Sequence, residues 1–401
     1  MIVIDRKADC CACGACVQIC PRKCISFHKD DEGFDYPKAD GSSCVHCGLC
    51  EKVCPVLNHF EPRKPLNIIA AINKNEEIRM SSSSGGIFYL LAEKIIKENG
   101  IVFGARYDVN WQVVMDYADS IDKINLFKGS KYVQASIGNT YKQCKAFLDE
   151  GRKVLFSGTP CQVAGLKHYL HKTYDNLLTV DFICHGVPSP MIWELYLDEV
   201  VKDGFSAIKS VDFRDKYFGW RRFGFNLKYK DGTRDITLSV PHSKNIYMRG
   251  FLNNLIIRPS CHDCKSKSGC SHSDITLGDF WGIRKINPEM YDNKGTSVVL
   301  CYTSKGSDIL KKCDIVYSSF DYEVIKKCNP SLIKSSLENK NRNSFFLNFN
   351  KRESIIKQLE EALHVPFHVR IKETFVRELY NIYMGGVFYI QKITKMIKRT
   401  M

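Results

Sequence analysis

The chain has 401 residues, and its 44% hydrophobic and 25% charged residues are typical of a globular protein with two or three domains. The net charge of +14 suits an anionic partner, but no zinc-finger, helix-turn-helix or RNA-binding signature accompanies it, so we expect no nucleic-acid binding. No run reaches the ~18 to 20 apolar residues of a membrane-spanning helix. No signal peptide precedes the 19 cysteines, so we expect a cytoplasmic protein with reduced thiols.

Two cysteine motifs of one form occupy residues 1–60. They are Cys10, Cys13, Cys16 and Cys20, followed by Pro21, and Cys44, Cys47, Cys50 and Cys54, followed by Pro55. Both match the C-x2-C-x2-C-x3-C-P run of bacterial two-cluster ferredoxins, in which the fourth cysteine of each run ligates the other cluster. We therefore predict a small domain with two 4Fe–4S clusters. A zinc site or a disulfide framework is the alternative.

The crossed ligation assigns each cysteine to a cluster. Cluster I would be held by Cys10, Cys13, Cys16 and Cys54, and cluster II by Cys44, Cys47, Cys50 and Cys20. Cys11 and Cys24 lie outside the pattern, and we expect neither of them to be a ligand. Residues 61–65, with two prolines and two cations, are typical of an extended linker.

From residue 66 to about 205, strand-like and helix-like runs alternate. The apolar periodicity predicts strands at 67–72, 101–103, 153–156 and 177–183, and helices at 87–98 and 162–170. Such alternation favours an α/β layer structure with some parallel pairing. Alternating apolar residues at 225–229 and 236–240 flank Asp231-Gly232, which predicts a β-hairpin. After residue 320 the sequence is helical and rich in lysine.

Two turns between a strand and a helix are candidate binding sites. Residues 81–86 read Ser-Ser-Ser-Ser-Gly-Gly, and such a loop presents backbone N–H groups that suit a phosphate, although a flexible serine linker would look similar. In the turn at 158–162, Thr159 is a candidate N-cap and Pro160 suits the first helical position. Cys161 would then lie in the first turn, where the helix dipole lowers a thiol pKa, unless it is simply a buried cysteine at a helix start.

A further cysteine group lies in the second half of the chain. Its members are Cys184, at a predicted strand end, and Cys261, Cys264 and Cys270. Their spacing indicates a metal site. A third 4Fe–4S cluster and a zinc site involving His262 or His272 are equally compatible with the residues alone.

Four motifs occur in a recognisable order, namely GSKYVQ at 129–134, GTPCQ at 158–162, CHGVPS at 184–189 and DITLGDFWG at 274–282. Together they resemble the beta-subunit family of coenzyme F420 (8-hydroxy-5-deazaflavin) hydrogenases and dehydrogenases, over roughly residues 1 to 310. The resemblance implies an α+β body that binds FAD with a 4Fe–4S cluster close to it. It also implies electron transfer between clusters and a deazaflavin or another organic substrate.

The resemblance also implies roles for individual residues. Those around the FAD would be Ser84, Gly85, Gly86, Gly158, Thr159, Pro160 and Gln162. Lys131 and Tyr132 would face the flavin or the substrate, and Cys161 is a third candidate catalytic residue. The body cluster would be held by Cys184, Cys261, Cys264 and Cys270. The last spacing is not constant among the relatives, so Cys161 is an alternative ligand to Cys270.

We therefore expect a two-cluster domain at 1–60, two parts of a flavin-binding body at 66–150 and 151–320, and a helical basic tail at 321–401. The fold class would be α+β, with an α/β-like body and a β-rich second half. The function would be that of an iron–sulfur flavoprotein oxidoreductase, which exchanges electrons with a redox partner protein or a deazaflavin. The alternative is a non-catalytic electron-carrier subunit that docks to a separate catalytic partner.

The chain ends in a basic segment with isoleucines at helical spacing. Ile390, Ile393 and Ile397 lie beside Lys392, Lys395 and Lys398. This pattern predicts a basic amphipathic helix that contacts an anionic membrane surface or a partner. A solvated terminal helix packed on the body is the alternative.

Overall fold

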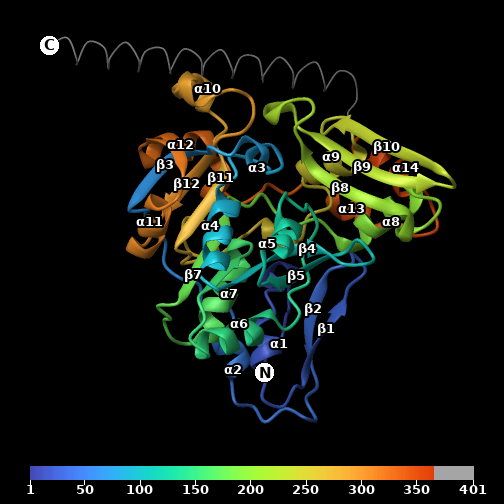
Figure 1. Ribbon diagram of the computed structural model, residues 1–401. Helices are drawn as coiled ribbons and strands as arrows, with labels where there is room; N and C mark the ends of the chain where they lie inside the picture. The colour runs from blue at the N-terminus through green and yellow to red at the C-terminus, as the bar shows by residue number, and fades with distance from the viewer. Residues whose placement is uncertain (365–401) are drawn as a thin grey trace.

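A computed structural model describes residues 1–364 of the chain, as Figure 1 shows. The predicted amphipathic helix near residue 393 lies outside the described residues. Within them, the fold is α+β, with a small N-terminal domain, an eight-stranded mixed sheet and a three-stranded antiparallel sheet. No helix of residues 1–364 combines the length and the apolarity that crossing a membrane requires.

The N-terminal domain, in blue at the bottom of Figure 1, contains two short helices and one β-hairpin. Its elements are α1 (Ala15–Ile19), β1 (Ile25–Lys29), β2 (Asp35–Ala39) and α2 (Leu49–Lys52). Each helix follows a glycine in the left-handed conformation, Gly14 with φ 77° and Gly48 with φ 73°. That conformation turns each cysteine loop sharply into its helix, which only glycine adopts without strain.

The eight-stranded sheet has the order β13-β3-β12-β11-β7-β6-β4-β5. The pairs β4–β6, β6–β7 and β7–β11 are parallel, which confirms the predicted parallel pairing. Its strands are β3 (Asn67–Asn73), β4 (Ile101–Tyr107), β5 (Val113–Ala118), β6 (Val154–Ser157), β7 (Leu177–Phe182), β11 (Ile275–Asp279), β12 (Ser297–Cys301) and β13 (Ile315–Ser319).

Helices cover both faces of this sheet because successive strand residues point to opposite sides. Val102 packs with α4 (Ile87–Lys97), whereas Ile101 and Phe103 pack with α6 (Thr140–Asp149) and α7 (Pro160–Leu170). The remaining helices of this body are α3 (Glu76–Met80), α5 (Ile121–Ile124), α10 (Ile283–Ile286), α11 (Ser304–Lys311) and α12 (Tyr322–Cys328).

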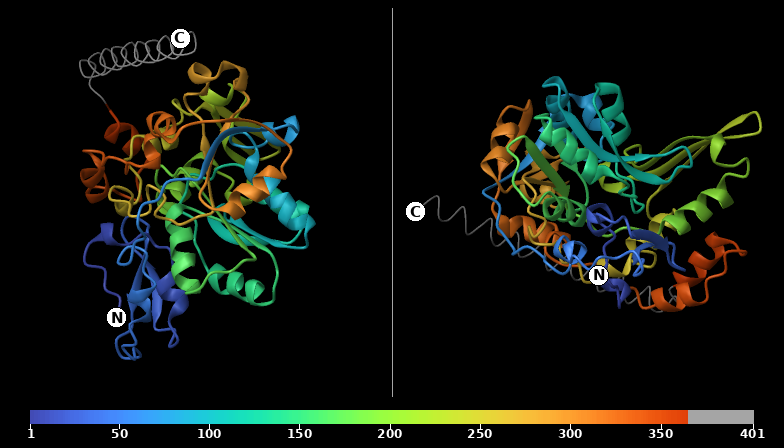
Figure 2. Two further views of the ribbon diagram at one scale, coloured as in Figure 1. Left: turned by 90° about the vertical axis from the view of Figure 1, so that its left-hand side faces the viewer. Right: turned by 90° about the horizontal axis from the view of Figure 1, so that it is seen from below.

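The three-stranded sheet lies to one side of the larger sheet, as the right-hand view of Figure 2 shows. It contains β8 (Ile208–Asp215), β9 (Gly224–Asp231) and β10 (Arg234–Pro241). The predicted hairpin is confirmed, since Phe225 pairs with Val240 and Leu227 with Leu238. Four helices share its hydrophobic core, namely α8 (Pro190–Val200), α9 (Ile246–Leu252), α13 (Arg342–Leu347) and α14 (Ile355–Ala362).

The direction of the strands collects the candidate motifs at one edge of the large sheet. Strands β3, β11, β7, β6 and β4 run in one direction, since β12 is antiparallel to both β11 and β3. The chain therefore leaves the carboxyl ends of β6, β7 and β11 at Gly158, Cys184 and Asp279 along this edge. The carboxyl edge of an α/β sheet is the usual place for a ligand site.

The N-terminal domain docks on the body through buried polar contacts. Arg342, from α13, forms a bidentate ion pair with Glu32 in the turn of the β1–β2 hairpin, and the Arg342 side chain is buried while that of Glu32 is 12% exposed. Gly33 follows with φ 81°, and a Cβ there would lie 2.2 Å from the Cβ of Met191. The hairpin turn thus fits against the body closely enough to require glycine.

Loss of the Glu32 carboxylate should loosen this docking. Glu32→Ala leaves the Arg342 guanidinium buried without its partner, which costs about 3 kcal/mol. We expect a clearly lower unfolding temperature and faster proteolysis between the two domains. Asp235→Ala is the control, because the Asp235–Lys209 pair is exposed and such pairs contribute under about 1 kcal/mol. Equal unfolding temperatures for the two variants would contradict this account.

Candidate functional site

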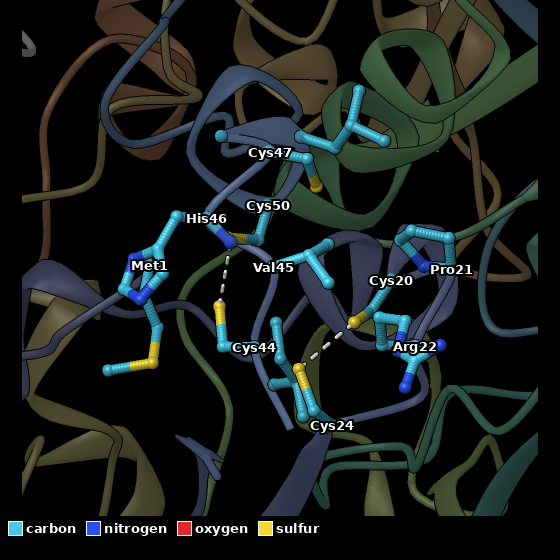
Figure 3. A pocket seen from close by; sticks show the side chains of 13 residues that line it. Met1, Cys20, Pro21, Arg22, Cys24, Cys44, Val45, His46, Cys47 and Cys50 are labelled. Atoms are coloured by element: carbon cyan, nitrogen blue, oxygen red, sulfur yellow. Dashed lines mark hydrogen bonds between the residues drawn. The ribbon is translucent and has the colours of Figure 1, made fainter. Parts of the chain in front are cut away.

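A cavity in the N-terminal domain is lined by the four cysteines predicted for cluster II. Cys44, Cys47 and Cys50 come from the second motif and Cys20 from the first, and Figure 3 shows them around the opening. Two backbone amides donate to these sulfurs, from Ile2 to Cys50 at 3.3 Å and from His46 to Cys44 at 3.4 Å. Amide donors of this kind stabilise thiolates that ligate a cluster.

A fifth cysteine lies at this cavity. The Sγ of Cys24 lies 3.4 Å from that of Cys20, as the dashed line in Figure 3 marks. The sequence pattern placed Cys24 outside the ligand set, and the pattern alone contains no signal that would put its side chain beside Cys20. The spacing of the motif describes the ligands only and not the segment that follows them.

The cysteines predicted for cluster I also influence one another. Cys10 and Cys13 lie in the loop that leads into α1, Cys16 lies in the first turn of α1, and Cys54 follows α2. Burial, together with the nearby Cys10 and Cys54 thiols, raises the pKa of Cys16 to about 12. Thiols so buried need a cationic partner in order to ionise, and an iron–sulfur core supplies one.

A second cavity lies between the N-terminal domain and the body. It is lined by five cysteines from four segments of the chain, namely Cys11, Cys161, Cys184, Cys261 and Cys264. Burial raises the pKa of Cys184 to about 12 and also raises the pKa of Cys261 and Cys264. The structure does not place Cys270, the fourth expected ligand, on this cavity, and puts Cys161 there instead.

Helix α7 connects this cavity with the first cysteine loop. Thr159 caps the helix, its Oγ1 lies 3.1 Å from the Sγ of Cys161, and the predicted N-cap is thereby confirmed. Further along α7, a Cβ on Gly165 would lie 2.9 Å from the Cβ of Cys13. The Cys13 thiol raises the pKa of Cys11, and the Cys11 thiol together with burial raises the pKa of Cys161. Cys11 therefore lies near both the first cysteine loop and the cavity.

The turn at 158–162 is largely occupied by its own capping interactions. The amide of Thr159 donates to Oε1 of Gln162 at 2.9 Å, and Gln162 is buried. Thr159 and Pro160 line the cysteine cavity. The structure therefore places this turn beside the cavity thiols. The other candidate turn, the serine loop of residues 81–86, follows β3. Three strands, β12, β11 and β7, separate β3 from β6, so the two turns lie apart along the sheet.

The serine loop belongs to a second centre, which is built around Arg214 from β8. The buried guanidinium binds both carboxylate oxygens of Asp279, at 2.8 and 2.9 Å. It also donates to the hydroxyl of Tyr132 at 3.2 Å and to the carbonyl of Ser83 at 3.0 Å. Arg214 thus joins the 129–134 motif, the serine loop and the 274–282 motif. The sequence contained no signal for it, since it stands alone in an ordinary strand.

Aromatic side chains enclose this guanidinium. Arg214 lies over the ring of Phe223 at 4.2 Å, and Trp220 donates to Asp279 at 2.7 Å. Trp281 stacks on Trp220 with ring centroids 5.2 Å apart and is 40% exposed. An aromatic surface therefore borders the serine loop, and a planar ring could stack on it.

One residue of the serine loop, Gly85, packs against the strands of the large sheet. The amide of Gly85 donates to Oγ of Ser297 at 2.9 Å, and a Cβ at Gly85 would lie 2.4 Å from the carbonyl of Ala71. In contrast, the amides of Ser83, Ser84 and Gly86 donate to no acceptor within residues 1–364. Gly85 is thus required by the sheet, and the neighbouring amides are the ones left to bind a ligand.

Lys131 and Tyr132 lie next to this loop. The Nζ of Lys131 donates to the carbonyls of Lys128 and Gly129, at 2.9 and 3.2 Å. Burial lowers the pKa of Lys131 to about 8. The carbonyl of Tyr132 accepts a hydrogen bond from the hydroxyl of Tyr247 at 2.8 Å, which fixes the segment. Of the predicted residues, Lys131, Tyr132, Ser84, Gly85 and Gly86 therefore gather at one centre.

Comparison with protein families identifies both parts of the chain. Residues 9–58 match the 4Fe-4S dicluster domain, and residues 151–317 match the C terminus of the coenzyme F420 hydrogenase/dehydrogenase beta subunit. The region 151–317 belongs to the coenzyme F420 hydrogenase/dehydrogenase beta-subunit family. The chain is therefore an electron-transfer protein related to the oxidoreductases of that family.

The family match has a defined extent. It begins just before β6 and includes Cys161, Cys184, Cys261, Cys264 and Arg214, whereas the serine loop and Lys131 lie outside it. Among solved structures, the F420-reducing [NiFe] hydrogenase complex from Methanosarcina barkeri is similar at 17% identity and a TM-score of 0.44, covering 69% of this chain and 97% of that one. The comparison with curated proteins found no match.

A methyl group at position 85 should disturb the sheet. Gly85→Ala places a Cβ against the backbone of Ala71 and Ser297, and such overpacking costs about 2 kcal/mol. Thermal unfolding should show this loss. Ser84→Ala is the control, because it removes only one hydroxyl, which donates to the carbonyl of Thr296. Equal stability of Gly85→Ala and wild type would contradict the packing role.

Proposed function

We propose that this protein is a cytoplasmic iron–sulfur flavoprotein oxidoreductase. It would transfer electrons between 4Fe–4S clusters, FAD and a deazaflavin or another organic substrate, and exchange electrons with a redox partner protein. The observation that supports this best is the cavity lined by five thiols, one of which, Cys11, comes from the dicluster domain. A carrier of electrons from that domain into the body requires such a junction.

The proposed ligand sets follow the geometry. Clusters I and II keep the crossed arrangement expected from the motifs. The body cluster is assigned to Cys161, Cys184, Cys261 and Cys264, because these four line one cavity. Cys11 is the nearest spare thiol and belongs to the path between the clusters in this proposal.

The serine loop fits the phosphates of FAD. Three amides, of Ser83, Ser84 and Gly86, lie at the start of α4, where the helix dipole favours an anion. Lys131 adds a positive charge close by, whereas the charge of Arg214 is balanced by Asp279. When bound, a flavin can take up a hydride and exchange single electrons, which 4Fe–4S clusters carry one at a time.

Lys131 and Tyr132 have properties that suit the substrate side of this centre. With a pKa near 8, the Lys131 amine can hold or release a proton at Nζ close to neutral pH. The hydroxyl oxygen of Tyr132 accepts from Arg214, and its ring lies 4.7 Å from that of Phe251, so its position is fixed. Both would orient the reacting ring rather than carry electrons.

The body cluster can be tested through iron content. Anaerobically purified protein should contain ~12 iron atoms, and Cys184→Ala and Cys161→Ala should each lose ~4 of them. Cys270→Ala is the matched control and should keep them, since Cys270 is not on the cavity. Iron and acid-labile sulfide analysis gives the result. Loss in Cys270→Ala but not in Cys161→Ala would refute the ligand set, and zinc in place of iron would refute the clusters.

Flavin binding needs a separate test. The isolated chain should contain FAD, and Ser83→Asp should weaken FAD binding roughly tenfold or more, because a carboxylate would face the phosphates. Ser81→Asp is the control, because Ser81 is exposed and its hydroxyl donates to the carbonyls of Glu77 and Ile78. Flavin fluorescence after denaturation measures the content. A wild-type chain that binds no FAD would instead support the carrier subunit without catalysis.

A further inference from the structure

Arg258 is a fully buried cation between the dicluster domain and the body. It lies three residues before Cys261, its side chain is 0% exposed, and it lines the cysteine cavity. Its guanidinium donates to the carbonyls of Cys10 and Asp35, at 2.8 and 2.9 Å, and to Oε1 of Gln134 at 3.1 Å. It stacks on the ring of Tyr36 at 4.2 Å. All three acceptors are neutral.

The other buried cations in the described part of the chain have a means of compensating their charge. Arg79, Arg214 and Arg342 pair with the carboxylates of Asp292, Asp279 and Glu32. Lys216 lacks a carboxylate, but burial and the charges of Arg214 and Arg79 lower its pKa to about 7, so it can lose its proton. Arginine cannot do so, because its guanidinium stays protonated in proteins.

Arg258 therefore needs a counter-charge that no carboxylate of residues 1–364 provides at ion-pair distance. A buried charge without one is costly. Two sets of predicted ligands surround it, Cys10 of cluster I and the four cysteines of the cavity. The Arg258 guanidinium donates to the carbonyl of Cys10, and Arg258 lines the same cavity as Cys161, Cys184, Cys261 and Cys264.

We propose that Arg258 is the shared counter-cation of cluster I and the body cluster, a positioning residue that raises the reduction potential of both. This inference rests on the proposed clusters. A 4Fe–4S core with four thiolates is a net anion, and its charge becomes more negative on reduction. A fixed cation therefore stabilises the reduced form more than the oxidised form. One guanidinium against both ligand sets would raise both potentials together.

The test compares variants that separate charge from geometry. Arg258→Gln removes the charge, whereas Arg258→Lys keeps it and loses the planar set of donors. In a redox titration followed by EPR, Arg258→Gln should lower the ratio of reduced to oxidised cluster I and body cluster by about tenfold at a fixed potential. Arg258→Lys should stay close to wild type. Cluster II, whose ligands do not contact Arg258, should be unchanged in both.

A double variant controls for docking. Glu32→Gln with Arg342→Met removes a buried ion pair from the same interface without changing its net charge. We expect weaker docking but no specific change in the potentials of cluster I and the body cluster. If this variant lowers both potentials as Arg258→Gln does, the effect comes from docking and the proposal fails.

Cluster loss is also informative. Loss of iron from cluster I and the cavity in Arg258→Gln, with retention in Arg258→Lys, would support a counter-charge. Loss in both, equal shifts in both, or unchanged potentials in Arg258→Gln would overturn the proposal. The iron content of the wild type separates this from the proposed function. If only ~8 iron atoms are present, the body cluster fails, and cluster I alone still tests Arg258.

Discussion

Helix α7 crosses the first cysteine loop at a glycine, and the arrangement between the two domains depends on this approach. A Cβ at Gly165 would lie 2.9 Å from the Cβ of Cys13 and 3.0 Å from its Sγ. The same helix begins at Pro160, beside the cavity, with Cys161 in its first turn. Because one rigid helix contacts both, the separation between the first cysteine loop and the body cysteines is set by the length of about one helical turn.

Two centres follow from that arrangement, and they use different chemistry. The cysteine cavity combines thiols with Arg258, a cation that pairs with no carboxylate of residues 1–364. The other centre combines Arg214 with the carboxylate of Asp279, so its charges are balanced within the protein. Both lie along the carboxyl edge of one sheet, since β6 and β7 lead to the cavity and β11 leads to Asp279.

Local patterns in the sequence predicted the dicluster motif and the β9–β10 hairpin, because spacing and alternation depend only on near neighbours. The register of Phe225 with Val240 is one example. The choice between Cys161 and Cys270 was different. Cys161 and Cys184 line the same cavity because they follow β6 and β7, which are parallel neighbours in the sheet. This strand order could not be predicted from the sequence. Arg214 and Arg258 left no signal at all, since a single arginine is usually a surface residue until its burial is known. The ligand sets and the flavin site remain proposals.

Two of the polar docking contacts of the dicluster domain involve residues far along the chain. Glu32 can form its ion pair only after Arg342, which is 310 residues further on, has been synthesised. The carbonyl of Cys10 likewise accepts a hydrogen bond only once Arg258 has been synthesised. During synthesis the cysteine loops therefore leave the ribosome long before the surfaces that cover them exist. Iron and sulfide can be delivered to the open loops in that interval, before the Glu32–Arg342 ion pair can form.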